Sequence, residues 1–162
     1  MARSGLEVLL EDVGWLKGRR VGLACNHTAV TRDLDHALPL LQAAGVEIAR
    51  VFAPEHGVDA LAQDMITVGD ESAVGTPGLQ IVSLYGDSAE SLRPDPAMLE
   101  DLDIILFDIQ DIGARYYTYQ ATLGYIMEVA ATVGTEIVVL DRPNPIDGVS
   151  IEGNIVEPGF ES

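Results

Sequence analysis

Five short apolar runs, each separated from the next by a longer segment, constrain the fold of this 162-residue chain more than any other feature. The runs are nearly continuous in apolar residues, which is the pattern of strands covered on both faces of a parallel sheet. They span residues 20–25, 46–52, 79–85, 103–107 and 136–140. Helix-like segments alternate with them. The sequence therefore predicts an α/β fold, a doubly wound, mostly parallel sheet of about five strands with helices on both faces.

The segments between the runs carry the helical spacing of apolar residues to different degrees. The clearest predicted helix covers residues 118–133, and Gly134 is suited to end it. Shorter helices are predicted over residues 5–17, 33–44 and 94–102. Pro39 removes a backbone hydrogen bond unless it lies in the first turn of its helix, so the sequence leaves the start of that helix open.

Charge and cysteine content exclude several classes of function. A formal net charge of −17 argues against binding to nucleic-acid phosphates or to anionic membrane surfaces. No run of about 18 apolar residues predicts a membrane span. Residues 1–5 lack the apolar core of a signal peptide, and the compartment stays open. Because Cys25 is the single cysteine, the chain has no internal disulfide and no cysteine-based zinc site.

No cofactor or metal is expected from the motifs. The turn after the first run reads C-N-H-T-A-V-T-R and lacks the glycines that let a backbone approach a dinucleotide pyrophosphate. No P-loop motif for phosphate occurs either. Glu55, His56 and the aspartates carry atoms that can bind metals, but no spacing among them specifies a metal site.

Polar side chains follow each apolar run and form the candidate site. Parallel strands place their carboxyl ends at one edge of a sheet, which is where ligands bind in α/β proteins. We therefore expect the residues at these ends to converge on one crevice: Asn26, Glu55, Tyr85, Asp108 and Asp141. The densest set of acids, amides and phenols lies after the fourth run, where residues 106–119 read L-F-D-I-Q-D-I-G-A-R-Y-Y-T-Y.

Glu55 is the sharpest candidate for catalysis. Pro54 fixes the backbone before it, and Gly57 permits a tight turn after it. A carboxyl group partly shielded at a strand end can have a raised pKa and act as a general acid, with His56 assisting or orienting it. The alternative is a carboxylate that only stabilises the turn or caps a helix.

A second carboxyl group is available after the fourth run. Glycoside hydrolysis commonly needs two carboxyl groups, and either Asp108 or Asp111 is suited to be the partner of Glu55. The alternative is structural: Asp108 caps the following turn, and Asp111 pairs with Arg115, a type of pair that can also position a site without reacting.

Aromatic and basic side chains near the same edge are candidates for binding a sugar. Tyr116, Tyr117 and Tyr119 can stack on a sugar ring, or two of the three can belong to the core at the start of the helix. Arg142 and Asn144 lie in the proline-stiffened sequence R-P-N-P and are suited to hold a carboxylate or amide substituent. The alternative for that loop is that it merely ends the fifth strand.

The residues after the first run have two interpretations. Asn26, with His27 and Thr28, can hydrogen-bond a ligand, or these residues can cap the next helix. Cys25 and His36 are interpreted as structural.

Five motifs, taken together and in their order along the chain, resemble a known family. They are N-H-T after the first run, F-A-P-E-H-G after the second, S-L-Y-G after the third, F-D-I-Q-D-I-G-A-R-Y-Y-T-Y after the fourth and L-D-R-P-N-P-I-D-G after the fifth. The series resembles the exo-β-N-acetylmuramidases of the NamZ/YbbC type and covers residues 5–157.

The resemblance implies a Rossmann-like N-terminal domain, a smaller C-terminal domain and an active cleft between them. Residues 1–162 would then be the N-terminal part of the Rossmann-like catalytic domain, without the second domain. The implied activity is release of N-acetylmuramic acid from the non-reducing end of peptidoglycan fragments, so the expected partner is a peptidoglycan-derived sugar. By motif position, Glu55 takes the role of the catalytic carboxyl, with His56 beside it. The implied cleft-lining positions are Asn26, Gln110, Asp111, Arg115, Tyr117, Arg142 and Asn144.

Two departures from the family pattern qualify these expectations. Ala60 stands where the family usually has a glycine, three residues after P-E-H-G. The family's chain also continues well past residue 162, so the alternative function is a carbohydrate-binding or assembly module that is not catalytic alone. A missing domain further predicts an exposed apolar patch, and hence self-association into a homo-oligomer.

Overall fold

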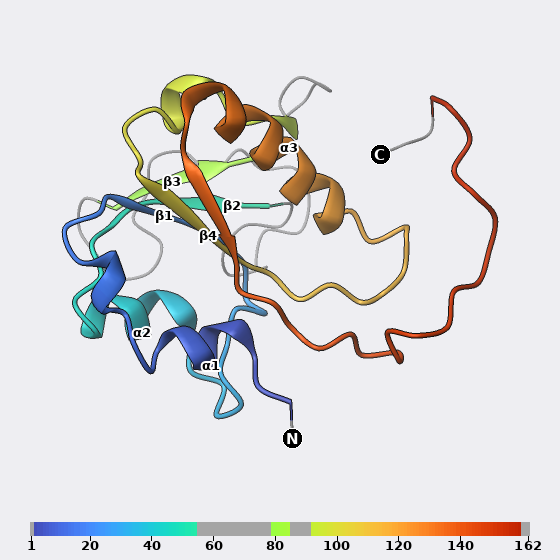
Figure 1. The fold of residues 1–162 in the computed structure, drawn as a ribbon, viewed down its shortest axis with the longest axis horizontal. Coiled ribbons are helices and arrows are strands. Elements are labelled where there is room, and N and C mark those ends of the chain that lie inside the picture. Colours follow the sequence, from blue (N-terminus) through green and yellow to red (C-terminus); the bar gives the residue numbers. More distant parts are fainter. Residues whose placement is uncertain (1, 55–78, 85–91, 160–162) are drawn as a thin grey trace.

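The computed structural model describes residues 2–54, 79–84 and 92–159. Five strands form one sheet in the order β3-β2-β1-β4-β5, and every neighbouring pair is parallel. The strands are β1 (Val21–Cys25), β2 (Ile48–Ala53), β3 (Gln80–Ser83), β4 (Ile104–Asp108) and β5 (Glu136–Val139). The predicted α/β architecture and its five parallel strands are confirmed (Figure 1).

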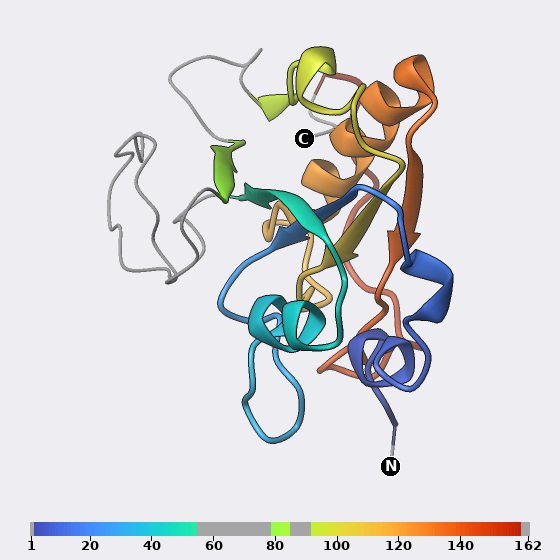
Figure 2. The ribbon, with the colours of Figure 1, turned by 90° about the vertical axis from the view of Figure 1, so that its left-hand side faces the viewer.

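Helices cover both faces of this sheet, as Figure 2 shows. One face carries α1 (Gly5–Leu9), the 3₁₀ turn η1 (Gly14–Leu16) and α2 (Ala37–Ala43). The other carries the 3₁₀ turn η3 (Pro96–Met98) and α3 (Tyr119–Val133). Within the described residues, no helix has the length and apolar composition needed to cross a membrane.

Side chains that alternate along the central strands divide the core into two layers. Leu23 and Leu106 belong to the cluster beneath α1 and α2, whereas Ile105 and Phe107 belong to the cluster beneath α3. Neighbouring residues of a strand point to opposite faces, so a strand covered on both sides is buried throughout. Both β1 and β4 are buried at every position. This double coverage explains why the apolar runs in the sequence are continuous rather than alternating.

The three shorter predicted helices are all reduced in the structure. The helix predicted over residues 5–17 ends at Leu9 and is followed by η1, because the carboxylate of Asp12 accepts the backbone N–H of Gly14 at 2.9 Å and stabilises a turn instead. The helix predicted over residues 94–102 contains only η3. In this segment the carboxylate of Asp95 accepts the backbone N–H of Ala97 at 2.9 Å. Hydrogen bonds of this kind, between a side chain and the nearby backbone, compete with helix formation in both segments.

Helix α2 begins later than the predicted residue 33 because a histidine caps it. His36 Nδ1 accepts the backbone N–H of Leu38 at 3.2 Å, so the first helical residue is Ala37. Pro39 consequently lies in the first turn, where a backbone N–H has no helical partner to lose. The prolyl ring is therefore accommodated at no cost in helical hydrogen bonds.

The strand order reverses between β1 and β4, at the centre of the sheet. The chain proceeds from β1 outward to β2 and β3, and then adds β4 and β5 on the other side of β1. Ligands of open α/β sheets bind beyond the carboxyl ends of the strands that flank such a reversal. Cys25, the last residue of β1, pairs with Asp108, the last residue of β4, so the connections after these strands begin side by side.

Replacing Gly5 by alanine is expected to destabilise the fold. Its N–H donates to the carbonyl of Asp141 at 2.6 Å, and an added Cβ would lie 2.5 Å from backbone atoms of Leu140 and Asp141. Because backbone atoms cannot move aside easily, Gly5→Ala should lower the free energy of unfolding by about 1–3 kcal/mol in urea denaturation. In the control Gly124→Ala the added Cβ meets nothing within 4 Å, and α3 should gain about 0.5–1 kcal/mol. Equal effects of the two substitutions on the free energy of unfolding would contradict the close contact of Gly5 with the backbone of Leu140 and Asp141.

Glu7 is expected to make stability depend on acid pH. Its carboxylate accepts the Nε–H of Arg32 at 2.6 Å and the backbone N–H of Ser4 at 3.0 Å. These bonds, led by the one from Arg32, lower the pKa of Glu7 from its ordinary 4.5 to about 2. The stabilising effect of the carboxylate is present above pH 4.5 and is lost as the pH falls through the folded-state pKa of about 2.

Glu7→Gln should therefore unfold at lower urea concentration than the parent chain near neutral pH, and this difference should shrink as the pH approaches that of the folded-state pKa. Arg32→Met removes the largest cause of the pKa shift and should weaken the same acid dependence. A Glu7→Gln difference that stays constant throughout the acid range would show that the carboxylate does not contribute in this way.

Candidate functional site

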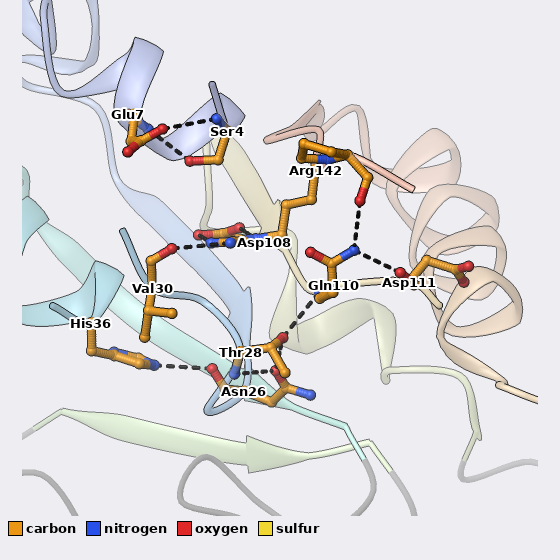
Figure 3. Close-up of polar contacts among 11 residues, drawn as sticks. Ser4, Glu7, Asn26, Thr28, Val30, His36, Asp108, Gln110, Asp111 and Arg142 are labelled. Carbon is orange, nitrogen blue, oxygen red and sulfur yellow. Dashed lines mark hydrogen bonds and ion pairs between the residues drawn. The ribbon is translucent and has the colours of Figure 1, made fainter. Parts of the chain in front are cut away.

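The connections after β1, β4 and β5 meet at the carboxyl edge of the sheet (Figure 3). Asn26 follows β1 directly, Gln110 and Asp111 lie just after β4, and Arg142 lies just after β5. Strand β2 ends at this same edge because it is parallel to β1. Residues far apart in the sequence are thus brought together where the parallel strands end.

A chain of hydrogen bonds joins the connections after β1 and β4. The Oδ1 atom of Asn26 accepts both the backbone N–H and the hydroxyl of Thr28, at 2.9 and 2.6 Å. The same hydroxyl oxygen accepts the backbone N–H of Gln110 at 3.0 Å. Asn26 is only 1% exposed. Helix capping, one of the two interpretations of this segment, is instead the role of His36, whose Nδ1 accepts the backbone N–H of Leu38. The Nε2 atom of His36 lies 3.0 Å from the backbone carbonyl of Asn26.

The side chain of Gln110 ties the connection after β4 to the one after β5. Its Nε2 donates to the backbone carbonyls of Asp111 at 2.6 Å and of Pro143 at 3.0 Å. Both carbonyls belong to loops rather than to strands. Gln110 therefore holds three connections in one arrangement, since its backbone N–H also reaches Thr28.

Asp108 and Arg142 form a buried ion pair beneath these loops. Arg142 donates from Nε and one terminal nitrogen to the two carboxylate oxygens at 2.6 and 3.0 Å, and from the other terminal nitrogen to the carbonyl of Val30 at 3.0 Å. The side chains are 0% and 8% exposed. Burial raises the pKa of Asp108 above its ordinary value, against the opposing effect of Arg142. The pair anchors the connection after β5.

Asp111 does not pair with Arg115, the structural alternative that the sequence offered. Its Oδ1 accepts the backbone N–H of Gly113 at 2.6 Å, whereas Arg115 donates to the backbone carbonyl of Asn154 at 2.6 Å. The Oδ2 atom of Asp111 is buried and has no hydrogen-bond partner among the described residues. Buried acceptors are nearly always paired in proteins, so this one marks Asp111 as a candidate functional residue.

An open pocket of about 420 Å³ lies between the turn after β4 and the extended segment that follows β5. Its lining includes Asp111, Arg115, Asn144, Ser150, Ile151 and Glu152. The last three were not foreseen as site residues, because the segment after residue 147 has no core-forming pattern. The one available signal was the sequence Asp147-Gly148, which indicates a turn. The turn forms, with Asp147 accepting the N–H groups of Val149 and Ser150.

The three tyrosines before α3 divide between core and surface. Tyr117 and Tyr119 pack edge to face, with ring centroids 4.7 Å apart, and both contact the core cluster beneath α3. Tyr116 is 82% exposed. Two of the three rings thus belong to the core, which was one of the two interpretations of these tyrosines. Tyr117 remains half-buried.

Several predicted site residues lie outside the described residues: Glu55, His56 and Tyr85. The loop position Ala60 lies outside them as well. In the part of the chain that the structure describes, no three histidine, cysteine or acidic side chains gather in a way that would hold a metal ion.

Breaking the buried ion pair is expected to be more damaging than breaking an exposed one. Asp108→Asn leaves the Arg142 charge buried and unpaired, which should cost about 3–5 kcal/mol of unfolding free energy. The double variant Asp108→Asn/Arg142→Met should recover part of this loss. Glu128→Gln, which breaks the exposed pair with Arg93, should cost less than about 1 kcal/mol. Equal losses in urea denaturation would contradict the burial of the Asp108 pair.

Comparisons with known proteins agree with this architecture. The chain is 41% identical to the peptidoglycan beta-N-acetylmuramidase NamZ of Bacillus subtilis strain 168, over 99% of this chain and 38% of that protein. A crystal structure of a DUF1343 family protein from Bacteroides fragilis matches 99% of this chain and 39% of its own, with a TM-score of 0.82 and 43% identity. A second DUF1343 structure from the same organism matches 88% of this chain and 35% of its own, with a TM-score of 0.68 and 31% identity.

The chain thus spans less than two fifths of the length of each of these relatives. A family model described as "Exo-beta-N-acetylmuramidase NamZ, N-terminal" matches residues 21–162, which include all five strands and the described connections at the carboxyl edge. The resemblance noted from the five motifs is confirmed, and the chain belongs to this N-terminal NamZ family.

Proposed function

We propose that this chain is the N-terminal part of a Rossmann-like catalytic domain that hydrolyses peptidoglycan fragments and releases N-acetylmuramic acid. The observation that carries the proposal is the polar edge at the reversal between β1 and β4, in a chain belonging to the NamZ family. Because the chain spans 38% of its Bacillus subtilis relative, we also propose that a further, C-terminal domain completes the cleft.

The described carboxyl groups differ in their suitability for chemistry. Asp108 is fully buried and both its oxygens are bonded to Arg142, so it supports the site from within. Asp111 lines the pocket and keeps Oδ2 unpartnered among the described residues. We assign Glu55, which follows the end of β2 by two residues in the sequence, as the general acid that protonates the leaving oxygen, assisted by His56. Asp111 is the better candidate for the second carboxylate.

The bound sugar would carry a carboxylate, because muramic acid bears a lactyl group. In a chain of net charge −17, such a ligand needs a local cation. Arg142 is committed to Asp108 and Val30, whereas the exposed Arg115 lines the pocket. Arg115 is therefore the proposed partner of the sugar carboxylate, and Arg142 supports the loop that carries Asn144.

The other proposed binding residues have different parts in this arrangement. Asn144 lines the pocket, although its Oδ1 already accepts the backbone N–H of Ile146 at 2.8 Å. Tyr117 is only half-buried, and we propose that its ring stacks on the sugar. Gln110 contributes indirectly, because its side chain donates hydrogen bonds to the loops after β4 and β5 and fixes their positions.

A carbohydrate-binding or assembly module is the second candidate function. The observation that favours it is a row of exposed apolar side chains in the segment after β5, formed by Ile146, Val149, Ile151 and Ile155. Such a row is suited to contact another protein surface. Self-association of the chain remains a prediction on the same grounds.

Glu55→Gln is expected to abolish hydrolysis. The amide cannot supply a proton to the leaving oxygen, so the rate of N-acetylmuramic acid release by the full-length protein from a disaccharide with N-acetylmuramic acid at its non-reducing end should fall about 10²–10⁴-fold. Glu47→Gln is the matched control, because Glu47 precedes β2 at the opposite edge of the sheet. That variant should keep the parent rate.

The outcomes separate the two candidate functions. Unchanged turnover in Glu55→Gln would remove Glu55 from the mechanism. Binding of N-acetylmuramic acid without hydrolysis by the full-length protein would favour the binding module. If the full-length parent protein neither binds nor hydrolyses the sugar, both the hydrolase and the carbohydrate-binding module are contradicted.

A further inference from the structure

The side-chain amide of Asn26 is buried but only half satisfied. The residue is 1% exposed, and its Nδ2 has no hydrogen-bond partner among the described residues. Buried polar groups are nearly always paired in proteins, so an unpaired one calls for an explanation. Asn26 stands at the carboxyl end of β1, beside the reversal of strand order where ligands bind in such sheets.

The orientation of this amide is determined by Thr28. The backbone N–H of Thr28 can only donate, so the atom that it meets at 2.9 Å must be the oxygen of the Asn26 amide. The Thr28 hydroxyl contacts the same oxygen at 2.6 Å. Rotating the amide by half a turn would place its NH₂ group against a donor. Nδ2 is consequently held on the side away from Thr28, as Figure 3 shows.

The Thr28 hydroxyl is fixed in turn by the connection after β4. Its oxygen accepts the backbone N–H of Gln110 at 3.0 Å, and its hydrogen is directed to Asn26 because Oδ1 can only accept. This bond links residues 82 positions apart in the sequence. The hydroxyl therefore bridges the two connections that flank the reversal of strand order.

A histidine holds the backbone at the same point. His36 Nδ1 accepts the N–H of Leu38, so the neutral ring carries its proton on Nε2 and donates it to the carbonyl of Asn26 at 3.0 Å. Backbone and side-chain oxygens of Asn26 are thus both occupied by protein donors. Among the side-chain atoms of Asn26, Nδ2 is the one left without a partner in the described part of the chain.

We propose that Thr28 is a positioning residue of the sugar site: its hydroxyl bridges Asn26 and Gln110 and presents the Asn26 Nδ2 as a donor to an acceptor oxygen of the bound amino sugar. The inference rests on the proposed function, which supplies the ligand. N-acetylmuramic acid offers ring hydroxyls and an acetamido carbonyl as acceptors. Threonine suits this role because its hydroxyl accepts one bond and donates another at the same time.

The test compares Thr28→Val, Thr28→Ser and the unsubstituted parent, each made as the full-length protein, because the proposed cleft needs both domains. Valine keeps the shape of threonine without the hydroxyl, whereas serine keeps the hydroxyl. N-acetylmuramic acid is titrated into each ¹⁵N-labelled protein, and the side-chain amide signals of Asn26 are followed by NMR. The parent protein and Thr28→Ser should bind with similar affinity and shift the Asn26 amide signals. Thr28→Val should bind about 3–10-fold more weakly.

Asn26→Asp tests the Nδ2 donor directly. It also keeps the proposal testable if Thr28→Val does not fold. Aspartate keeps an oxygen for Thr28 but replaces the Nδ2 donor by an acceptor, so binding should weaken by at least about 10-fold. Thermal unfolding of each variant checks that the fold is retained. Rescue by serine distinguishes positioning by the hydroxyl from a general effect of altered packing.

The failures of the two proposals are distinguishable. If the parent protein binds the sugar but Thr28→Val binds equally well, or the Asn26 amide signals do not move, the role of Thr28 is overturned and the proposed function stands. If the full-length parent protein does not bind N-acetylmuramic acid, the proposed function and this inference are overturned together.

Discussion

The parallel pairing of β1 with β4 is the constraint on which the candidate site depends. Both strands are buried at every position, so apolar packing against helices on the two faces fixes their place in the sheet. Their register sets Cys25 opposite Asp108. Once that register is set, the residues immediately after each strand have little freedom, and the bond between Thr28 and Gln110 follows from it. The site is polar, but apolar side chains position it.

The polar groups at this edge contribute specificity more than stability. A buried ion pair such as Asp108–Arg142 gains little over an apolar replacement, because both charges lose their hydration. Its three hydrogen bonds nevertheless define one position for the connection after β5. The Oδ2 atom of Asp111, which has no partner in the part of the chain that the structure describes, adds to the cost of folding. The fold tolerates these unfavourable contributions to its folding free energy because the two apolar clusters supply most of its stability.

The fold was predictable from the sequence because burial on both faces leaves a direct record in the chain. Continuous apolar runs marked all five strands, and the helical spacing of residues 118–133 marked α3. The breaks in the other helices depend on single bonds from Asp12 and His36 to the backbone. Bonds of this kind depend on local geometry that hydrophobic periodicity does not record.

The candidate site was predictable in its location but not in its pairings. Parallel strands and polar strand ends sufficed to place Asn26, Gln110 and Asp111 at one edge. The partner of Asp108 depends on β5 lying next to β4, which the sequence does not specify. The alternative in which Asp111 pairs with Arg115 does not form. Side chains four residues apart meet on a helix, and the described residues 110–117 are not helical.

The contact between Gly5 and Asp141 gives this fold a fixed order of completion during synthesis on the ribosome. Helix α1 emerges before every strand of the sheet, yet the carbonyl that receives its first N–H emerges after β5. Asp108 likewise precedes its counter-ion, so the carboxylate must stay hydrated until Arg142 has left the exit tunnel. A nascent chain stalled before residue 142 therefore lacks both its closing contact and its buried cation, and it would present an unfinished sheet to chaperones and proteases.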